Sequence, residues 1–341
     1  MLPSPDITQW PALKLRGLTL SPPLLVAPMA GITNSAFRRL LAGFGGHGAL
    51  YTEMLAAKPL LVENFASSPF VRRRPEEGTL IYQLLAPQPD RLPEIVERLR
   101  AVEAAGLDLN CGCPAPDARV VAGGAHLFID PERLRRVLDT LRAAFPGPLT
   151  VKVRLGFRAD AGWEERFLAN LRLFEECGVD AVTLHPRFAE ERLKRPVLRD
   201  RWAWAAAHTR LPVIANGDIT GRQTLEAHPE AFRGVAAVMV GRQAIAQPWL
   251  CSRWNQPDWR PADPAAPWEL LRDYLEEDFS PKKAFLRLRD FTFWYARNFR
   301  FGHALHAGAQ HAPDIPALRT RALAFLRAEP AWSRHLSFSG L

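Results

Sequence analysis

The chain has 341 residues, of which 48% are hydrophobic and 23% charged; this is typical of a globular protein and excludes a fibrous or low-complexity chain. No apolar run reaches the roughly 20 residues of a membrane helix, the first residues lack the pattern of a secretion signal, and four cysteines are too few for a disulfide scaffold, so we expect a cytoplasmic protein without membrane contact. The net charge of +8 favours a polyanionic partner such as nucleic acid, although a basic enzyme without such a partner can have the same balance.

Short apolar runs alternate with amphipathic stretches along the first 242 residues. In one such stretch, residues 91–106, the apolar side chains follow a helical spacing. Alternation of strands and helices predicts parallel strands, and eight units in about 230 residues match a (β/α)8 TIM barrel, with a doubly wound sheet as the alternative. The predicted strands are residues 24–29, 49–54, 80–85, 106–111, 149–156, 181–187, 212–218 and 236–242.

The composition changes at residues 255–268, where turn-forming residues predict a linker. After it, residues 268–279, 282–301 and 315–329 predict helices and no strand pattern appears. We therefore expect a barrel domain over residues 1–255 and an all-helical domain over residues 263–341. From residue 281 to the end, ten Lys and Arg stand against three Asp and Glu, a net charge of +7 that favours RNA binding by this domain.

Residues that are unusual for apolar strands, most of them polar, close nearly every predicted strand. Because the carboxyl ends of barrel strands meet at one mouth, these residues are expected to lie together. Burying them unpaired would cost roughly 1–3 kcal/mol each, so a ligand-filled site is the simpler interpretation. They are Pro28 and Met29, Glu53, Gln83, Asn110 and Cys113, Lys152 and Arg154, His185 and Arg187, Asn216 and Asp218, and Gly241 and Arg242.

Lys152 is one of only six lysines and lies between valines in a predicted strand. It could reach the rim as an ordinary long side chain, or hold a cation against an electron-rich ring or a developing negative charge. The segments ANGDI and VGR at the last two strand ends combine glycine-rich turns with Arg242, a pattern that favours phosphate binding. Taken singly, each segment is also compatible with a simple turn or a surface charge.

Two cysteines stand one residue apart in GLDLNCGCPAP, residues 106–116. A metal pair would need further ligands that the neighbouring sequence does not offer, and a disulfide between such close residues is strained. Cys111, still on the strand, is expected to be a small core residue. Cys113 follows Gly112 and precedes a proline, so its thiol is expected at the mouth within reach of a substrate, with core packing as the alternative.

Two further motifs resemble known sites without fitting them. GFGGHG, residues 43–48, has the spacing of a dinucleotide loop but follows a helix and precedes a strand, the reverse of the required order. HALHAGAQH, residues 303–311, gathers three histidines without a carboxylate, so we expect a solvated or RNA-facing surface there.

Seven segments together resemble, in order and spacing, the flavin-dependent tRNA-dihydrouridine synthases. They are APMAGITNSAFR, QLLAPQP, DLNCGCPAP, VKVRLG, LHPR, PVIANGDIT and VGRQAIAQPW. The likeness spans about residues 24–250, and the helical tail resembles the RNA-binding domain of that family. It implies an enzyme with FMN, using NADPH as a transient reductant, that reduces the C5–C6 double bond of uridines in tRNA to dihydrouridine. We expect a monomer without a stable protein partner.

The resemblance also implies roles for individual residues. Cys113 would donate a proton to uracil C5 while hydride passes from flavin N5 to C6, and Asn110, Arg154 and Arg187 would contact the substrate. A neutral thiol with a pKa of about 8.5 can serve as such an acid. No metal is expected. The FMN-binding residues would be Pro28, Met29, Ala30, Gln83, Lys152, His185, Asn216, Gly217, Asp218, Gly241 and Arg242.

Base chemistry within folded RNA requires the target to be flipped out, which a wide basic surface would support. The candidate surface comprises Arg72, Arg73 and Arg74, the loop 187–201, and Lys282, Lys283, Arg287, Arg297 and Arg300 in the tail. Phe291, Trp294 and Tyr295 could stack on nucleotides, but their spacing is also typical of helix core.

Three functions compete on this evidence. The first is the RNA-uridine reductase, acting on tRNA or on another RNA. The second is a flavin barrel that reduces a free pyrimidine or enone, against which the basic tail argues. The third is an RNA-binding flavoprotein without turnover.

Overall fold

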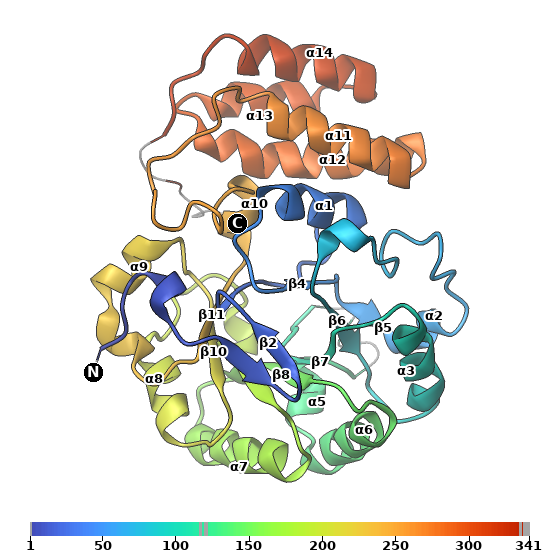
Figure 1. Ribbon diagram of the computed structural model, residues 1–341, viewed down its shortest axis with the longest axis vertical. Helices are drawn as coiled ribbons and strands as arrows, with labels where there is room; N and C mark the ends of the chain where they lie inside the picture. The colour runs from blue at the N-terminus through green and yellow to red at the C-terminus, as the bar shows by residue number, and fades with distance from the viewer. Residues whose placement is uncertain (1, 116–117, 119–121, 334–335, 337–341) are drawn as a thin grey trace.

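Eight parallel strands close into a barrel at the centre of the larger body (Figure 1). The computed structural model describes residues 2–115, 118, 122–333 and 336. Around the barrel the order is β3-β11-β10-β9-β8-β7-β6-β4, and a parallel bridge between Leu25 and Ala49 joins the first and last strands. The strands are β3 (Leu24–Val26), β4 (Leu50–Tyr51), β6 (Leu80–Leu85), β7 (Gly106–Cys111), β8 (Leu149–Gly156), β9 (Ala181–Phe188), β10 (Val213–Asn216) and β11 (Ala237–Val240).

The predicted TIM barrel is therefore confirmed, with one difference in its second strand. The sequence predicts one strand over residues 49–54, but the pairing with β6 is interrupted: β4 pairs with its start and β5 (Leu55–Ala56) with its end. The irregular residues between β4 and β5 include Glu53, which is 8% exposed at this rim of the barrel.

A β-hairpin that the sequence analysis did not predict packs against the amino end of the barrel. It consists of β1 (Leu13–Leu15) and β2 (Leu18–Leu20), and its turn uses Gly17 at a φ of +82°. Figure 1 shows it crossing in front of the strands. Its leucines join the inward-facing residues Tyr51, Ile81 and Met239 in one apolar cluster, and these side chains close this end of the barrel.

Strand alternation separates an outer core from a polar interior. Leu107, Leu109 and Cys111 of β7 belong to the core between strands and helices, whereas Asp108 and Asn110 alternate with them. The surrounding helices are α1 (Ser35–Phe44), α2 (Ala57–Leu60), α3 (Leu92–Ala101), α5 (Ala125–Phe128), α6 (Pro131–Ala144), α7 (Trp163–Glu176), α8 (Asp200–Ala207), α9 (Arg222–Ala227) and α10 (Arg242–Ala246). Asn34 and Asp130 cap α1 and α6 by accepting hydrogen bonds from backbone N–H groups of the first turn.

Among the described residues, four α-helices follow the barrel: α11 (Ala266–Asp278), α12 (Pro281–Tyr295), α13 (Gly302–Gln310) and α14 (Ile315–Leu326). The predicted helix over 282–301 was too long, because the chain turns sharply after Tyr295. A Cβ on Gly302 would lie 1.7 Å from the carbonyl oxygen of Ala296, so only glycine allows this close approach. The histidine-rich segment predicted as surface forms α13, with His303 exposed and Leu305 buried.

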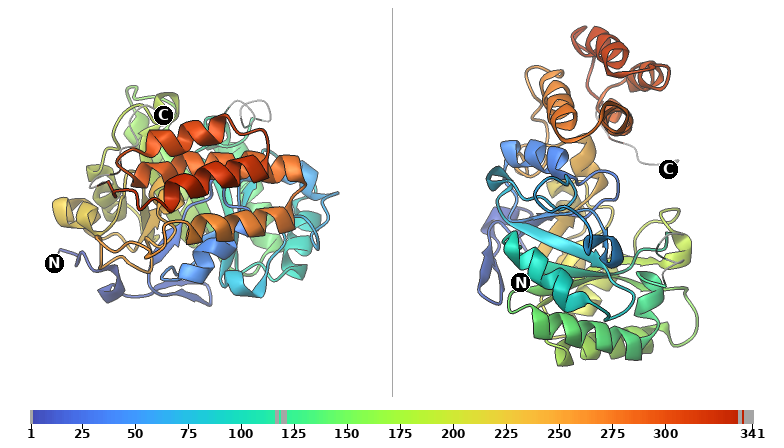
Figure 2. Two further views of the ribbon diagram at one scale, coloured as in Figure 1. Left: turned by 90° about the horizontal axis from the view of Figure 1, so that it is seen from above. Right: turned by 90° about the vertical axis from the view of Figure 1, so that its right-hand side faces the viewer.

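The helical region stacks on α1 and α10 at one side of the barrel (Figure 2). The Phe37 and Phe291 rings lie 6.2 Å apart across this junction, and Arg39 donates to Glu277 at 2.7 Å. The buried residues of both parts form one continuous apolar core. The boundaries 1–255 and 263–341 stay a prediction. In the described part of the chain, none of the helices combines the length and apolar character that crossing a bilayer requires.

Candidate active site

A pocket of about 790 Å³ opens at the carboxyl ends of β8 to β11 and β3. Its lining comes from widely separated strands, as expected for a barrel mouth. Eleven of the residues predicted to bind cofactor or substrate line it: Pro28, Met29, Lys152, Arg154, His185, Arg187, Asn216, Gly217, Asp218, Gly241 and Arg242. Predicted residues outside this lining are Ala30, exposed just beyond it, and Gln83, Asn110 and Cys113 on the β6–β7 side.

Positive charge dominates the pocket wall. Burial and the neighbouring Arg154 lower the pKa of Lys152 to about 8, and burial beside Arg187 lowers the pKa of Arg154 to about 10. Burial and the surrounding cations hold the pKa of His185 well below its usual value. Arg187 donates to His185 Nε2 at 2.7 Å, so that nitrogen carries no proton. Because His185 is neutral and its neighbours are cations, the positive charge of this wall favours an anionic ligand.

Asp218 is the carboxylate that bridges two of these cations. Its two oxygens accept hydrogen bonds from Arg187 and, at 2.9 Å, from Arg242. The neighbouring strand end is fixed by Asn216, whose side chain donates to the Met239 carbonyl oxygen at 2.9 Å. The predicted phosphate-binding segments of β10 and β11 are thus brought side by side.

Two predicted substrate contacts are engaged with the loop after β9. Arg154, 8% exposed, donates to the carbonyl oxygens of Phe188 and Arg192 at 3.1 and 2.8 Å. Arg187, 2% exposed, donates to Arg195 O at 2.5 Å besides its bonds to His185 and Asp218. Both guanidinium groups therefore anchor the loop at the mouth, a task that the sequence pattern did not indicate.

On the other side of the mouth, Cys113 lies two residues after the end of β7, and the side chain of Asn110 holds its backbone. The Asn110 Oδ1 atom accepts from Cys113 N at 2.9 Å and from Gly112 N at 3.1 Å. Its Nδ2 donates to Gln83 Oε1 at 2.9 Å, and Gln83 Nε2 donates to Asp108 Oδ2 at 2.7 Å. The backbone that carries the thiol is thus held at the end of a row of buried side chains that are hydrogen-bonded to one another.

The two cysteines of the CxC pair differ as the sequence analysis expected. Cys111 is 1% exposed in the outer core, and burial raises the pKa of its thiol well above the usual value. Cys113 is half-buried in the segment that follows the strand. The described residues contain no group of His, Cys, Asp and Glu side chains that could hold a metal ion.

The sequence analysis expected Glu53 at the mouth without a defined task and did not single out Asp108. Glu53 accepts from Gly31 N at 2.7 Å and so holds the turn after β3, while burial raises its pKa. Asp108 accepts from Thr150 Oγ1 at 2.6 Å and from Gln83. Strand alternation could have found Asp108, because it is two residues from Asn110 and so shares its face.

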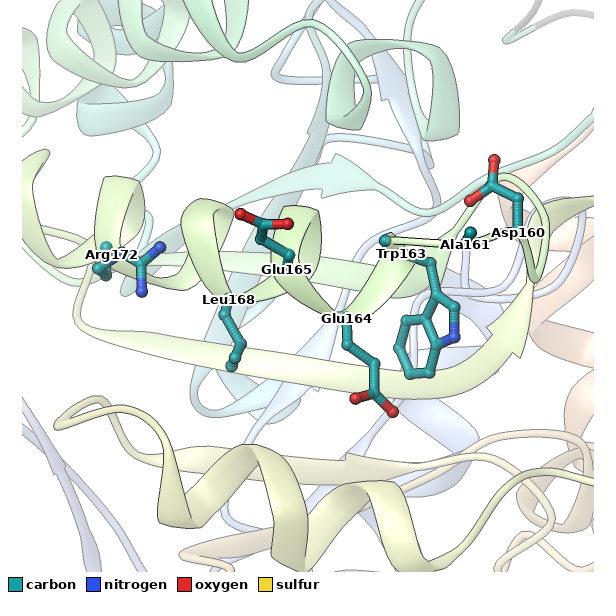
Figure 3. Close-up of a pocket in the computed structure, with 8 residues that line it drawn as sticks. Asp160, Ala161, Trp163, Glu164, Glu165, Leu168 and Arg172 are labelled. Carbon is teal, nitrogen blue, oxygen red and sulfur yellow. The ribbon is translucent and has the colours of Figure 1, made fainter.

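Another hollow, of about 550 Å³, lies away from the mouth along α7 (Figure 3). It is lined by Trp163, Leu168 and charged residues such as Glu164 and Arg172. None of the predicted site residues contributes to the lining of this hollow.

Comparisons with known proteins agree with the geometry. The family model described as dihydrouridine synthase matches residues 25–321. A protein from Ralstonia nicotianae named tRNA-dihydrouridine(16) synthase is 32% identical over 272 residues, 74% of this chain and 80% of that protein. A Yersinia pestis protein named tRNA-dihydrouridine synthase B is 28% identical over 307 residues, 86% of this chain and 94% of that protein.

Among solved structures, the old yellow enzyme from Trypanosoma cruzi is similar with a TM-score of 0.55, covering 78% of this chain and 95% of that one. At 12% identity this likeness concerns the fold alone. The family match spans the barrel and most of the helical region, and five of the seven motifs of the resemblance contribute residues to the pocket lining. The chain belongs to the dihydrouridine synthase family and is an oxidoreductase.

Proposed function

We propose that this protein reduces the C5–C6 double bond of uridines in tRNA to dihydrouridine, with FMN as its cofactor and NADPH as its reductant. The observation that carries the proposal is the juxtaposition, at one barrel mouth, of a cationic pocket and a cysteine presented beside it. Family membership supports the reaction, and the names of the relatives support tRNA as substrate.

The residues present fit a flavin mononucleotide. Lys152, Arg187 and Arg242 supply positive charge for the phosphate and the electron-rich ring. At Gly217, with φ +111°, a Cβ would lie 2.7 Å from His185 Cδ2, so a side chain there would press on the pocket wall. At Gly241 the nearest atom to such a Cβ is Ala27 Cβ at 3.8 Å, which leaves space for a ligand against the backbone. When bound and reduced by NADPH, FMN would supply the hydride for uracil C6.

Three residues of the site would then have defined tasks in the reaction. Cys113 would hold the proton at Sγ and transfer it to C5 of the uracil. Asn110 would place the uracil edge, although its amide is already shared with Gln83 and the Cys113 backbone. Lys152, with a pKa of about 8, is protonated at neutral pH and would stabilise negative charge on the adjacent ring.

A second cluster of cations extends the pocket outward and supports NADPH over NADH. Lys194, Arg195 and Arg199 line the same pocket, as do residues of α9. Arg195 has a distant carboxylate, Glu191, at 3.8 Å, and the buried Arg199 Nε has no hydrogen-bond partner among the described residues. A phosphomonoester is the group that distinguishes NADPH from NADH, and such a cluster suits it.

The test is an assay of the purified protein with FMN, NADPH and unmodified tRNA transcripts. We expect NADPH oxidation coupled to a mass gain of two hydrogens on uridines of the transcript. Reduction of free uracil in preference to RNA would favour the small-molecule reductase. Activity on another RNA but not on tRNA would change the substrate and leave the reaction intact. RNA binding by a yellow protein that never couples NADPH oxidation to RNA would refute the proposal.

A further inference from the structure

A row of buried polar side chains runs inside the barrel from β8 to the loop that carries Cys113. The acid in this row is Asp108, which is 1% exposed. Asp108 Oδ1 accepts from Thr150 Oγ1 at 2.6 Å, and Oδ2 accepts from Gln83 Nε2 at 2.7 Å. Both carboxylate oxygens are therefore satisfied, and three hydrogen bonds in series connect the acid to the Cys113 N–H group.

The row has a direction because its members differ in what they can donate. A carboxylate only accepts, so Gln83 must turn its NH₂ group toward Asp108 and its carbonyl oxygen toward Asn110. Asn110 must then donate to Gln83 with Nδ2, at 2.9 Å, which leaves Oδ1 facing the N–H groups of Gly112 and Cys113. Each amide orientation follows from the one before it, and Asp108 sets the first.

The opposite orientation would place two donors against each other. If Gln83 were flipped, Asn110 would present its NH₂ group to the N–H groups of Gly112 and Cys113, and these partly buried donors would be left without an acceptor. An unsatisfied buried donor costs more than a hydrogen bond contributes. With its two oxygens equivalent as acceptors, the Asp108 carboxylate excludes that flipped state, whereas an amide at position 108 would admit both.

We propose that Asp108 is a positioning residue, which orients the amides of Gln83 and Asn110 and thereby holds the backbone that presents Cys113. The consequence for catalysis rests on the role proposed for Cys113 above; the effect on the backbone does not. A buried carboxylate is costly to keep in a barrel, and burial raises its pKa to about 6. Lys152 offsets part of that cost by its positive charge.

The experiment compares amide hydrogen exchange at Gly112 and Cys113 in the full-length protein and three variants. Asp108→Leu removes both acceptor oxygens, Asp108→Asn keeps one acceptor but allows the flip, and Thr150→Val removes only the donor to Oδ1. Thr150→Val is the matched control, because its Asp108 still accepts from Gln83.

We expect Asp108→Leu to speed exchange at these amides about tenfold, the scale of removing one or two net hydrogen bonds. Asp108→Asn should give an intermediate increase, and Thr150→Val should leave exchange at Gly112 and Cys113 unchanged. If Asp108→Leu does not fold, the comparison of Asp108→Asn with Thr150→Val carries the test. Equal exchange in all folded variants would overturn the proposal.

Uridine reduction provides the second readout. The rate should be highest in the wild type, lower in Asp108→Asn and lowest in Asp108→Leu, so that the more conservative variant retains more activity. Faster exchange without this fall in uridine reduction would contradict a catalytic use of the positioning. If the wild type itself neither binds FMN nor reduces uridine, the proposed function fails, whereas the exchange data still decide how Asp108 acts on the backbone.

Discussion

Cys113 is the residue on which the proposed proton transfer depends, and Cys111 is its natural control. Cys113→Ala should retain FMN and its reduction by NADPH but lose roughly 10²–10⁴-fold in uridine reduction, the usual scale for general acid catalysis. Stopped-flow absorbance separates the two half-reactions. Cys111→Ala should cost about 1 kcal/mol of stability, as a small core truncation does, with little change in rate. An equal rate decrease in both variants would assign the acid to the wrong thiol.

Lys152 gives a prediction about stability and pH. Its pKa falls from 10.5 in the unfolded chain to about 8 in the fold, so between these values the unfolded state binds more protons and the free energy of unfolding rises with pH. Lys152→Met should therefore stabilise the flavin-free protein by on the order of 2 kcal/mol at pH 7, after discounting for contact with solvent in the pocket. Urea unfolding should show this advantage shrinking as the pH approaches 10.5, and FMN affinity should drop. If Lys152→Met were less stable than the wild type, the claim that the buried Lys152 cation destabilises the fold would be wrong.

Arg199 tests the nicotinamide preference. Arg199→Gln should lower the ratio of kcat/KM for NADPH to that for NADH about tenfold, as expected for one charge-assisted hydrogen bond to a phosphate. Calorimetric titration with 2′,5′-ADP and with 5′-ADP gives a readout that needs no turnover. Arg210→Gln serves as the control, because Arg210 is exposed and already paired with Glu175 at 3.1 Å. An unchanged ratio would place the extra phosphate elsewhere.

At the scale of single elements, the sequence predicted what periodicity encodes. All eight barrel strands were located, because their apolar runs are bounded by turns and followed by polar residues. The hairpin β1–β2 was missed because its strands are only three residues long, although leucines alternate around the Arg16–Gly17 turn. The end of α12 was missed because the close approach at Gly302 depends on a contact with Ala296 that no local pattern announces.

The same limit applies to the site. Residue type at the strand ends predicted which side chains line the pocket, since the carboxyl ends of barrel strands must converge. It could not predict that Arg154 and Arg187 anchor carbonyl oxygens of the loop after β9, because those partners are set by the loop path. Phe291 and Tyr295, weighed as stacking platforms, stack on each other in the core at 5.3 Å.

Helix α12 carries the prediction about RNA binding. Lys282 and Lys283 are exposed in its first turn, whereas Arg287 lies over the Phe279 ring at 4.1 Å. The double variant Lys282→Ala/Lys283→Ala should weaken tRNA binding and reduce the slope of log K against log salt by about 2, one for each phosphate that the lysines no longer neutralise. Fluorescence anisotropy over a salt series measures it. An unchanged slope would exclude these lysines from the interface.

At the scale of the whole molecule, part of the basic surface has another use. Arg72 and Arg74, predicted to face RNA, form ion pairs with Asp278 at the end of α11, and Arg39 reaches Glu277 at 2.7 Å. These pairs join the barrel to the helical region beside the continuous apolar core. Of the cations predicted to face RNA, we therefore propose that Lys282, Lys283 and the loop 187–201 contact the substrate.

The central claim is that hydride and proton reach one uridine from two sides of this mouth. Its most direct test is an anaerobic single turnover, in which the protein with reduced FMN is mixed with unmodified tRNA transcript and no free NADPH. Flavin reoxidation should match dihydrouridine formation one for one in the wild type, and both should slow together in Cys113→Ala. A protein that takes up no FMN, or reduced flavin that stays reduced in the presence of tRNA, would contradict the account.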